Sequence, residues 1–195
     1  EVYDVSPQRR QLCLDAAEST MAALEKQQAG DISLYVGIPF CPTRCIYCSF
    51  VSAATEKSRK LIPVYLKALE QETYAAAEGL GQHPHRIRTV YIGGGTPTTL
   101  SAEELRWLLR TLHQAFDLSE CLEFTVEAGR PDTLDPEKLL AIRQEGATRI
   151  SINPQTMDDR VLEIMGRSHS SEDILRAYEQ ALAAGHTDIN MDLIA

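Results

Sequence analysis

A regular alternation of strand-like and helix-like segments constrains the fold of this chain more than any other feature of its sequence. Short runs with a period of two are separated by longer runs in which apolar residues recur every three or four positions. This order predicts an α/β fold with a parallel sheet or barrel. We expect strands at residues 32–39, 88–93, 122–127, 149–153 and 188–194, and helices at residues 6–28, 63–79, 101–116, 135–146, 158–165 and 171–184.

The domain organisation follows from length and from the polarity of the first segment. The chain has 195 residues, of which 44% are hydrophobic, and this is enough for one sizeable core. The first helical run is polar, and Ala29-Gly30 suits its end. We therefore expect an N-terminal helical segment at residues 1–30 and a core domain at residues 31–195.

Three of the predicted strands carry polar side chains on one face and apolar side chains on the other. Helices that cover a sheet should pack on the apolar face, because successive side chains of a strand point to opposite faces. The polar faces should then line a wide interior that holds a polar ligand, with an open sheet and one solvated face as the alternative. The polar set is Glu123, Thr125, Glu127, Ser151, Asn153, Gln155, Asp188, Asn190 and Asp192, and the apolar set is Leu122, Phe124, Val126, Ile150, Ile152, Ile189, Met191 and Leu193.

Three of the five cysteines, Cys41, Cys45 and Cys48, lie close together with the spacing C-x₃-C-x₂-C. Structural zinc requires four ligands, and no fourth Cys or His lies at a fitting offset. Three thiolates suit a 4Fe–4S cluster that leaves one iron open for a ligand. The loop follows a predicted strand, which is where α/β barrels place active sites. An odd number of cysteines indicates a reducing compartment, and we expect Cys13 and Cys121 to be ordinary buried thiols.

Charge and hydropathy exclude two classes of partner. The net charge of −9 and the pI near 5.0 disfavour nucleic-acid binding, because phosphates must be neutralised by Lys and Arg. No apolar run approaches the roughly 20 residues of a membrane span, and no signal peptide is visible. We therefore expect no nucleic acid, no membrane span and a cytoplasmic location. His83 and His85 lie in a polar connection and could ligate haem or a metal, although a solvated loop is the simpler interpretation.

Six segments, in order, resemble the radical S-adenosylmethionine (SAM) family, specifically oxygen-independent coproporphyrinogen III oxidase and its relatives. They are Tyr35-Val-Gly-Ile-Pro-Phe-Cys41, Gly93-Gly-Gly-Thr-Pro-Thr98, Val126-Glu-Ala, Pro154-Gln155, Gly166-Arg167 and Asn190-Met-Asp192-Leu-Ile. The resemblance covers about residues 31–195. It implies a partial (β/α) radical SAM barrel with five parallel strands of an open six-strand barrel. We expect this barrel to be truncated at both ends, with its C-terminal part missing.

Carried over by position, the resemblance implies that Cys41, Cys45 and Cys48 bind the 4Fe–4S cluster. It implies SAM contacts at Tyr35, Tyr47, Gly94, Gly95, Thr96, Glu127, Gln155, Arg167 and Asp192. The glycines would let the backbone approach the methionine part of SAM. Taken alone, a triple glycine is more often a turn, and Arg167 could equally be a surface residue at a helix end. Glu127 matches the ribose carboxylate, and we expect the side chains of residues 127, 155 and 192 to point inward.

The resemblance also implies a reaction. A small reducing electron-transfer protein would reduce the cluster, and SAM would be cleaved to methionine and a 5′-deoxyadenosyl radical. The radical would take a hydrogen atom from a propionate of coproporphyrinogen III, and loss of carbon dioxide would leave a vinyl group. Two such steps give protoporphyrinogen IX in anaerobic haem biosynthesis. No catalytic residue is assigned beyond those that hold the cluster and SAM.

Two departures from the family pattern bear on the substrate. Phe50 stands where the best-known oxidases have a further cysteine, and Ser49 stands where haem chaperones usually have Asp. The run Cys48-Ser-Phe and the segment Ser151-Ile-Asn-Pro-Gln-Thr-Met157 most resemble the Gram-positive-type oxidase subgroup, also called coproporphyrinogen dehydrogenase. A haem-binding chaperone without decarboxylase activity and an anaerobic haem-degrading enzyme are the alternatives. Because the chain stops on the fifth strand, we expect it to bind SAM but to form little or no vinyl product.

Overall fold

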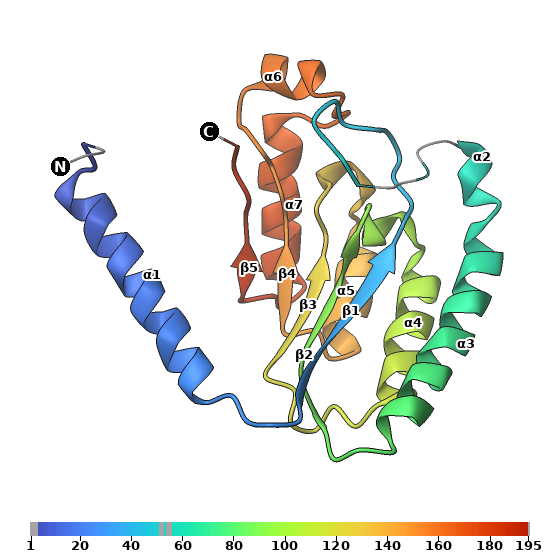
Figure 1. The fold of residues 1–195 in the computed structure, drawn as a ribbon. Coiled ribbons are helices and arrows are strands. Elements are labelled where there is room, and N and C mark those ends of the chain that lie inside the picture. The colour runs from blue at the N-terminus through green and yellow to red at the C-terminus, as the bar shows by residue number, and fades with distance from the viewer. Residues whose placement is uncertain (1–3, 51–52, 54–55, 195) are drawn as a thin grey trace. The chain divides into compact units, whose positions relative to one another are not determined.

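Five parallel strands form one sheet, and their order in the sheet follows the sequence, β1-β2-β3-β4-β5 (Figure 1). The computed structural model describes residues 4–50, 53 and 56–194. Parallel neighbours that follow one another in sequence need crossover connections, which the helices supply. The predicted α/β fold is therefore confirmed. The strands are β1 (Asp31–Ile38), β2 (Arg86–Gly94), β3 (Glu123–Glu127), β4 (Arg149–Ser151) and β5 (Ile189–Asn190).

The longer helices of the core begin where the sequence provides N-caps or a proline. Ser101 and Ser170 open α4 and α7 with capping boxes, and Asp135 caps α5 by accepting a hydrogen bond from the Lys138 N–H at 2.8 Å. The predicted helices are all found close to their expected bounds. The single-turn elements α2, η1 and η2 were not predicted, because they are too short to show a periodic pattern. The elements are α2 (Glu56–Arg59), α3 (Ile62–Leu80), α4 (Ala102–Ala115), α5 (Pro136–Gln144), α6 (Asp159–Ile164), α7 (Ser171–Ala183), η1 (Pro97–Thr99) and η2 (Pro131–Thr133).

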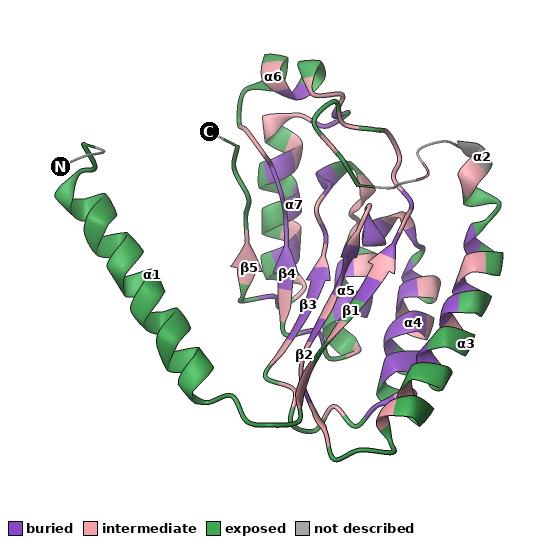
Figure 2. Ribbon diagram, viewed as in Figure 1, coloured by how far each residue is buried: buried purple, intermediate pink, exposed green. Residues whose placement is uncertain are grey.

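The core lies between the apolar face of the sheet and helices α3, α4, α5 and α7 (Figure 2). On β3 and β4 and directly after β4, the predicted apolar side chains are almost fully buried. The helices add buried leucines and small residues, and Figure 2 shows the buried positions of these helices in purple. The strand side chains are Val36, Ile38, Val90, Ile92, Phe124, Val126, Ile150 and Ile152, and the main helix side chains are Leu66, Leu69, Leu105, Leu108, Leu109, Leu112, Leu139, Ile142, Ala177 and Ala181.

Three predictions for the apolar face were wrong. Leu122 is 69% exposed because it precedes the first residue of β3. Met191 and Leu193 are exposed because β5 ends at Asn190, well before the expected residue 194. A single bridge between Gln155 and Leu193 continues the pairing of β4 and β5 beyond the regular ladder. β5 also has only one neighbour in the sheet, so its side chains are less enclosed than those of β3 and β4.

The chain divides into two compact units, Glu1–Asp31 and Ile32–Ala195. In the first, α1 (Pro7–Glu25) begins at Ser6, whose hydroxyl accepts a hydrogen bond from the Arg9 N–H at 3.3 Å. Every residue of α1 is exposed, so the expectation of a buried Cys13 thiol was wrong. Its apolar residues do not gather into the stripe that would bury a thiol. Among the described helices, none combines the length and apolarity that a membrane crossing needs.

Candidate active site

The cysteine loop and the carboxyl ends of the strands enclose a cavity of about 140 Å³. Its wall is built from the loop after β1 and from segments that follow β2, β3, β4 and α6. The predicted residues that line it are Cys41, Cys45, Cys48, Tyr47, Gly95, Thr96, Glu127, Gln155 and Arg167. The structure thus brings together most of the residues matched to the family, although they are spread over more than a hundred positions of sequence.

Cys41 is held by contacts with Ala53 and with the residues that follow β2. Its N–H donates to the Ala53 carbonyl at 3.4 Å, and its Sγ accepts from the Thr96 hydroxyl at 3.5 Å. The Gly95 and Thr96 N–H groups donate to the Ile38 and Phe40 carbonyls, both at 2.8 Å. A Cβ at position 95 would lie 2.7 Å from the Phe40 carbonyl oxygen and 2.9 Å from the Cys41 Sγ. Only glycine allows this close approach of two strand ends.

The middle of the loop is tied to the turn that follows α6. The Ile46 N–H donates to the Met165 carbonyl at 3.1 Å, and the Thr43 hydroxyl donates to the Gly166 carbonyl at 2.9 Å. A turn from the Cys45 carbonyl to the Cys48 N–H, at 3.1 Å, places the last two thiols near each other. The cysteine loop is therefore anchored at both its first cysteine and its middle.

The three thiols fit an iron–sulfur cluster better than a single metal ion. All three are free, partly buried and line the same cavity. No group of three His, Cys, Asp or Glu side chains within the described residues is arranged to hold one metal ion. In a 4Fe–4S cluster each thiolate binds a different iron, so the sulfur atoms stand further apart than around a single ion. A set of three cysteines would leave one iron of such a cluster without a protein ligand. The cavity that the cysteines line also includes Glu127 at the end of β3 and Asn153 and Gln155 after β4.

Glu127 provides an oriented acceptor at the end of β3. Its carboxylate accepts hydrogen bonds from the Gly94 N–H and from the Tyr91 hydroxyl. Burial raises the pKa of Glu127, and the Asp192 charge adds to that rise, while the two hydrogen bonds lower it part of the way. Burial and the Glu127 charge raise the pKa of Tyr91 to about 12, so this hydroxyl stays protonated and donates. A Cβ at Gly93 would lie 2.9 Å from the Glu127 Oε2, so position 93 must also be small.

Arg167 presents a buried cation to the same cavity. Its Nε and Nη2 donate to the Tyr47 hydroxyl at 3.2 and 3.0 Å, and its Nη1 donates to the Gly129 and Asn153 carbonyls at 3.3 and 2.8 Å. These four hydrogen bonds go to neutral oxygen atoms, so they orient the guanidinium without neutralising it. Burial raises the pKa of the Tyr47 phenol, although Arg167 partly offsets that rise. Four of the five Arg167 N–H donors are used in this way, so one Nη2 N–H and the positive charge remain for a bound anion.

Asn153 was placed on the polar face from the sequence but received no role. It is 5% exposed and lines the cavity, and its side-chain Oδ1 is buried without a hydrogen-bond partner among the residues that the structure describes. Buried acceptors are rarely left unpaired, so this atom indicates a donor on a bound ligand. Next to it, Gln155 has a φ of 67°. This left-handed conformation lies four residues after the end of β4, and the Gln155 side chain lines the cavity.

Three predicted residues lie outside the cavity wall. Tyr35 is 61% exposed, and its ring stacks on that of Tyr91 with centroids 6.0 Å apart. Gly94, with a φ of 106°, contributes its N–H to Glu127 rather than to the wall. Asp192 is exposed, although its charge raises the pKa of both Tyr91 and Glu127, which places it on their face of the sheet. The inward orientation expected for residues 127 and 155 is found, whereas Asp192 is on the expected face but open to solvent.

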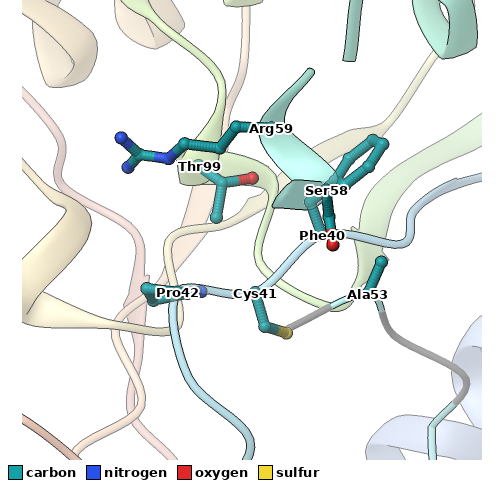
Figure 3. A pocket seen from close by; sticks show the side chains of 7 residues that line it. All are labelled: Phe40, Cys41, Pro42, Ala53, Ser58, Arg59 and Thr99. Carbon is teal, nitrogen blue, oxygen red and sulfur yellow. The ribbon is translucent and has the colours of Figure 1, made fainter. Parts of the chain in front are cut away.

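A second cavity, of about 240 Å³, lies on the other side of Cys41 (Figure 3). Figure 3 shows Arg59 extending past Thr99, with Cys41 and Pro42 on the opposite side of the hollow. Its remaining lining residues are Phe40, Ala53 and Ser58. Cys41 therefore lines both cavities. Of the two, only the smaller is also lined by Cys45, Cys48 and most of the residues matched to SAM contacts.

The remaining predictions concern histidines and a cysteine away from the site. His83 is exposed and His85 is partly exposed, and the ring Nδ1 of His85 lies 2.9 Å from the His83 carbonyl oxygen within their own turn. This agrees with a solvated loop. Cys121 is half-buried, and burial raises the pKa of its thiol.

Comparisons with known proteins agree with this arrangement. The radical SAM superfamily model matches residues 35–195. The oxygen-independent coproporphyrinogen-III oxidase-like protein HemZ of Bacillus subtilis (strain 168) is 41% identical over 165 residues, covering 84% of this chain and 33% of that protein. The heme chaperone HemW of the same strain is 40% identical over 166 residues, covering 83% and 42%. The structure of coproporphyrinogen III oxidase (HemN) from Escherichia coli gives a TM-score of 0.75 at 29% identity, covering 90% of this chain and 40% of that one.

The chain belongs to the radical SAM superfamily. The resemblance inferred from its motifs is confirmed at this level and for the HemN-like group. The family implies a 4Fe–4S cluster and SAM, and the donor set and the cavity fit both. The chain spans about a third to two fifths of the length of these relatives.

Proposed function

We propose that this radical SAM protein holds a 4Fe–4S cluster on Cys41, Cys45 and Cys48 and cleaves SAM in the adjoining cavity. One observation carries the proposal: the three thiols share a single cavity with an acceptor, Glu127, and a cation, Arg167. SAM has ribose hydroxyls and a carboxylate, which are the groups that such a pair would bind. When bound together, the cluster and SAM supply one-electron chemistry that makes a primary carbon radical, which no protein side chain provides.

The chain's own residues would bind and orient the cosubstrate. Arg167 is held by four hydrogen bonds and would offer its remaining Nη2 N–H and its positive charge to the SAM carboxylate. Glu127 accepts a hydrogen bond from a ribose hydroxyl, and the Gly94 N–H and Tyr91 hydroxyl fix its orientation. The Asn153 Oδ1, which has no protein partner, accepts a further hydrogen bond from the ligand. Each of these groups is held before SAM arrives, which reduces the entropy lost on binding.

We further propose that the substrate of the whole protein is coproporphyrinogen III. Each reacting propionate would lose a hydrogen atom to the radical, then carbon dioxide, and one electron to an acceptor, and the product of two such steps is protoporphyrinogen IX. The names of the HemZ and HemN relatives support this substrate class. Ser49 and Phe50 further support the Gram-positive-type subgroup. A small reducing electron-transfer protein would supply the electron that cleaves SAM.

A haem chaperone is the second candidate. The HemW relative matches this chain nearly as well as HemZ does, so similarity alone does not separate decarboxylation from haem transfer. Both candidates use the same cluster and SAM residues, and they differ in the porphyrin that is bound and in whether vinyl groups are formed.

Anaerobic reconstitution with iron and sulfide tests the cluster and SAM chemistry. We expect about four irons per chain, by the chemistry of cysteine-ligated clusters, and 5′-deoxyadenosine on addition of dithionite and SAM. Cys45→Ala should lose both. Cys121→Ala, which removes a thiol outside the cavity, should keep both. A wild-type chain without iron, or equal losses in the two variants, would contradict the assigned ligands.

The porphyrin-directed step is tested on the longest natural protein that carries this sequence. With SAM, a reductant and coproporphyrinogen III under anaerobic conditions, we expect vinyl products by mass spectrometry. Tight haem binding together with SAM cleavage but no decarboxylation would support the chaperone instead. The same assay on residues 1–195 should show SAM binding with little or no vinyl product.

A further inference from the structure

A buried arginine that the sequence analysis did not single out lies beside the cysteine loop. Arg130 lies three residues after the end of β3, caps the N-terminus of η2, and lines the same cavity as the three thiols. It is only 4% exposed. A cation this buried is costly unless charge and hydrogen bonds compensate for its lost hydration. The groups that contact the Arg130 guanidinium therefore matter for its role.

One edge of the Arg130 guanidinium is bound by Asp132, whose side chain is 19% exposed. Its Nε and Nη2 donate to the two carboxylate oxygens of Asp132, both at 3.0 Å, in a bidentate pair. The His169 Nδ1 lies 3.4 Å from the Asp132 Oδ1, and the His169 side chain is fully buried. Burial alone would raise the pKa of Asp132, but His169 and Arg130 outweigh it and hold that pKa well below its usual range. Since an ionised carboxylate only accepts, the Nδ1 of His169 carries the proton.

The other edge of the guanidinium faces the cysteine loop. The Arg130 Nη1 donates to the Thr43 hydroxyl at 2.8 Å and to the Thr43 carbonyl at 3.3 Å, and it lies 4.0 Å from the Cys45 Sγ. The Thr43 hydroxyl in turn donates a hydrogen bond to the Gly166 carbonyl at 2.9 Å. A single cation thus joins the loop between the first two cysteines to the end of β3 and to the turn after α6.

The turn that carries Arg130 is itself braced. The Thr133 N–H and hydroxyl donate to the Arg130 carbonyl at 3.0 and 2.8 Å, and the Thr133 and Thr98 hydroxyls lie 2.6 Å apart. The arginine is therefore fixed from its backbone as well as through its side chain. A charge held this firmly acts at a constant distance from the Cys45 sulfur.

We propose that Arg130, oriented by Asp132 and His169, is a positioning residue that holds the Cys41–Cys48 loop in its ligating shape and places a fixed positive charge beside the Cys45 sulfur. The inference rests on the proposed cluster. Charge and hydrogen bonds near the sulfur atoms set the reduction potential of such clusters. The positive charge of Arg130 would stabilise the reduced, more negative form of the cluster and so raise its reduction potential. The negative charge of Asp132, on the far edge of the guanidinium, would lower that potential.

Because the two charges should shift the potential in opposite directions, two substitutions test the proposal. A general loss of structure would not produce opposite shifts. Arg130→Gln removes the cation, so the midpoint potential of the cluster should become more negative than in wild type. Asp132→Asn removes the opposing anion, so the midpoint potential should become less negative. Both are measured by redox titration followed by electron paramagnetic resonance, with all variants at the same pH. Arg130→Lys keeps the charge and should restore most of the wild-type potential.

The control is Arg110→Gln. Arg110 makes an equally bidentate pair with Glu145, at 2.9 and 2.7 Å, on the surface between α4 and the end of α5. Its loss should change neither the potential nor the loop. Arg130→Gln should also lose iron to a chelator about 10- to 100-fold faster, the range typical for groups that orient metal ligands.

A second readout needs no metal. Amide hydrogen exchange of residues 41–48 in the cluster-free chain should be faster in Arg130→Gln and unchanged in Arg110→Gln. Equal exchange in wild type and Arg130→Gln would overturn the positioning role. Shifts of the potential in the same direction for Arg130→Gln and Asp132→Asn would overturn the electrostatic role. A wild-type chain that takes up no iron would instead count against the proposed cluster, while the exchange measurement would still decide whether Arg130 holds the loop.

Discussion

Single residues at the site combine burial with charge, and Glu127 illustrates the consequence for binding. Its carboxylate is fixed by the Gly94 N–H and the Tyr91 hydroxyl and faces the cavity. Glu127→Ala should weaken SAM binding by about 1.5–3 kcal/mol, or on the order of ten- to a hundredfold in Kd, because a ribose hydroxyl loses a charged acceptor. Isothermal titration of the cluster-loaded chain measures this. Glu123→Gln, on the same strand but outside the cavity wall, should leave Kd unchanged.

The same carboxylate should oppose folding at neutral pH. Since the pKa of Glu127 is raised in the folded chain above its ordinary value of 4.5, the folded state binds this proton more tightly than the unfolded state. That contribution to stability is present below the unfolded pKa and is lost as pH rises through the folded one. The free energy of unfolding of Glu127→Gln, relative to wild type, should therefore increase as pH rises above 4.5. Urea titrations of the cluster-free chains at several pH values check this, and a difference that shrinks with pH would contradict it.

Gly95 should be the glycine least able to accept a side chain. A Cβ there would meet the Phe40 and Ile38 carbonyl oxygens and the Cys41 Sγ at 2.7–2.9 Å, and backbone atoms cannot move aside cheaply. Gly95→Ala should cost about 1–3 kcal/mol of stability, as overpacking does, and should reduce iron uptake because Cys41 is displaced. Denaturant unfolding and iron analysis measure the two effects. Wild-type iron uptake in Gly95→Ala would show that Cys41 does not depend on this contact.

Among single residues, the sequence predicted the functional groups whose partners lie close in sequence. The spacing of Cys41, Cys45 and Cys48 indicated a cluster by itself, because three ligands lie within one loop. Arg130 was missed because its partner Cys45 is 85 positions away. Asn153 was missed for a related reason: an unpaired amide oxygen becomes visible only when the cavity around it is known.

Among the elements, the helices were the most predictable. Caps at Ser101, Asp135 and Ser170 are local signals, and the helices begin beside them. The ends of β4 and β5 were not predictable in this way. β4 ends at Ser151, and the left-handed backbone of Gln155 in the segment that follows has no signal in the sequence, because a non-glycine residue adopts that conformation only under tertiary constraint. The prediction that Leu122 is buried was also wrong, because an apolar residue just before a strand fits the alternating pattern as well as one inside the strand does.

Helix α3 offers a test of local propensity that is independent of the site. Gly79 lies within α3, and a Cβ there would meet no atom within 4 Å. Gly79→Ala should stabilise the chain by about 0.4–1 kcal/mol, because alanine restricts the unfolded chain and favours the helix. Thermal or urea unfolding measures the gain. Loss of stability in this variant would mean that the C-terminal turn of α3 is not helical in solution.

At the scale of the whole molecule, one face of the sheet forms the core and the other carries polar residues of the site. The apolar face packs on helices, and the residues matched to SAM contacts lie at the carboxyl ends of the strands and on the polar face. Leu109, on α4, is fully buried in the core and is absent from the cavity wall. Leu109→Ala should therefore cost about 2–5 kcal/mol of stability while leaving the SAM Kd of the folded protein unchanged. A parallel loss of affinity, measured well below the midpoint of unfolding, would show that the two faces are coupled.

The order of the strands also has a consequence for synthesis. Since β1 to β5 follow one another in both sequence and space, the ribosome delivers the cysteine loop before the residues that enclose it. Cys41, Cys45 and Cys48 emerge well ahead of Arg130 and Arg167. A nascent chain therefore exposes three neighbouring thiols while they still lack their enclosing wall, when stray metals and oxidants have free access to them. Cluster delivery to this protein is best timed after translation has passed the turn at Gly166-Arg167.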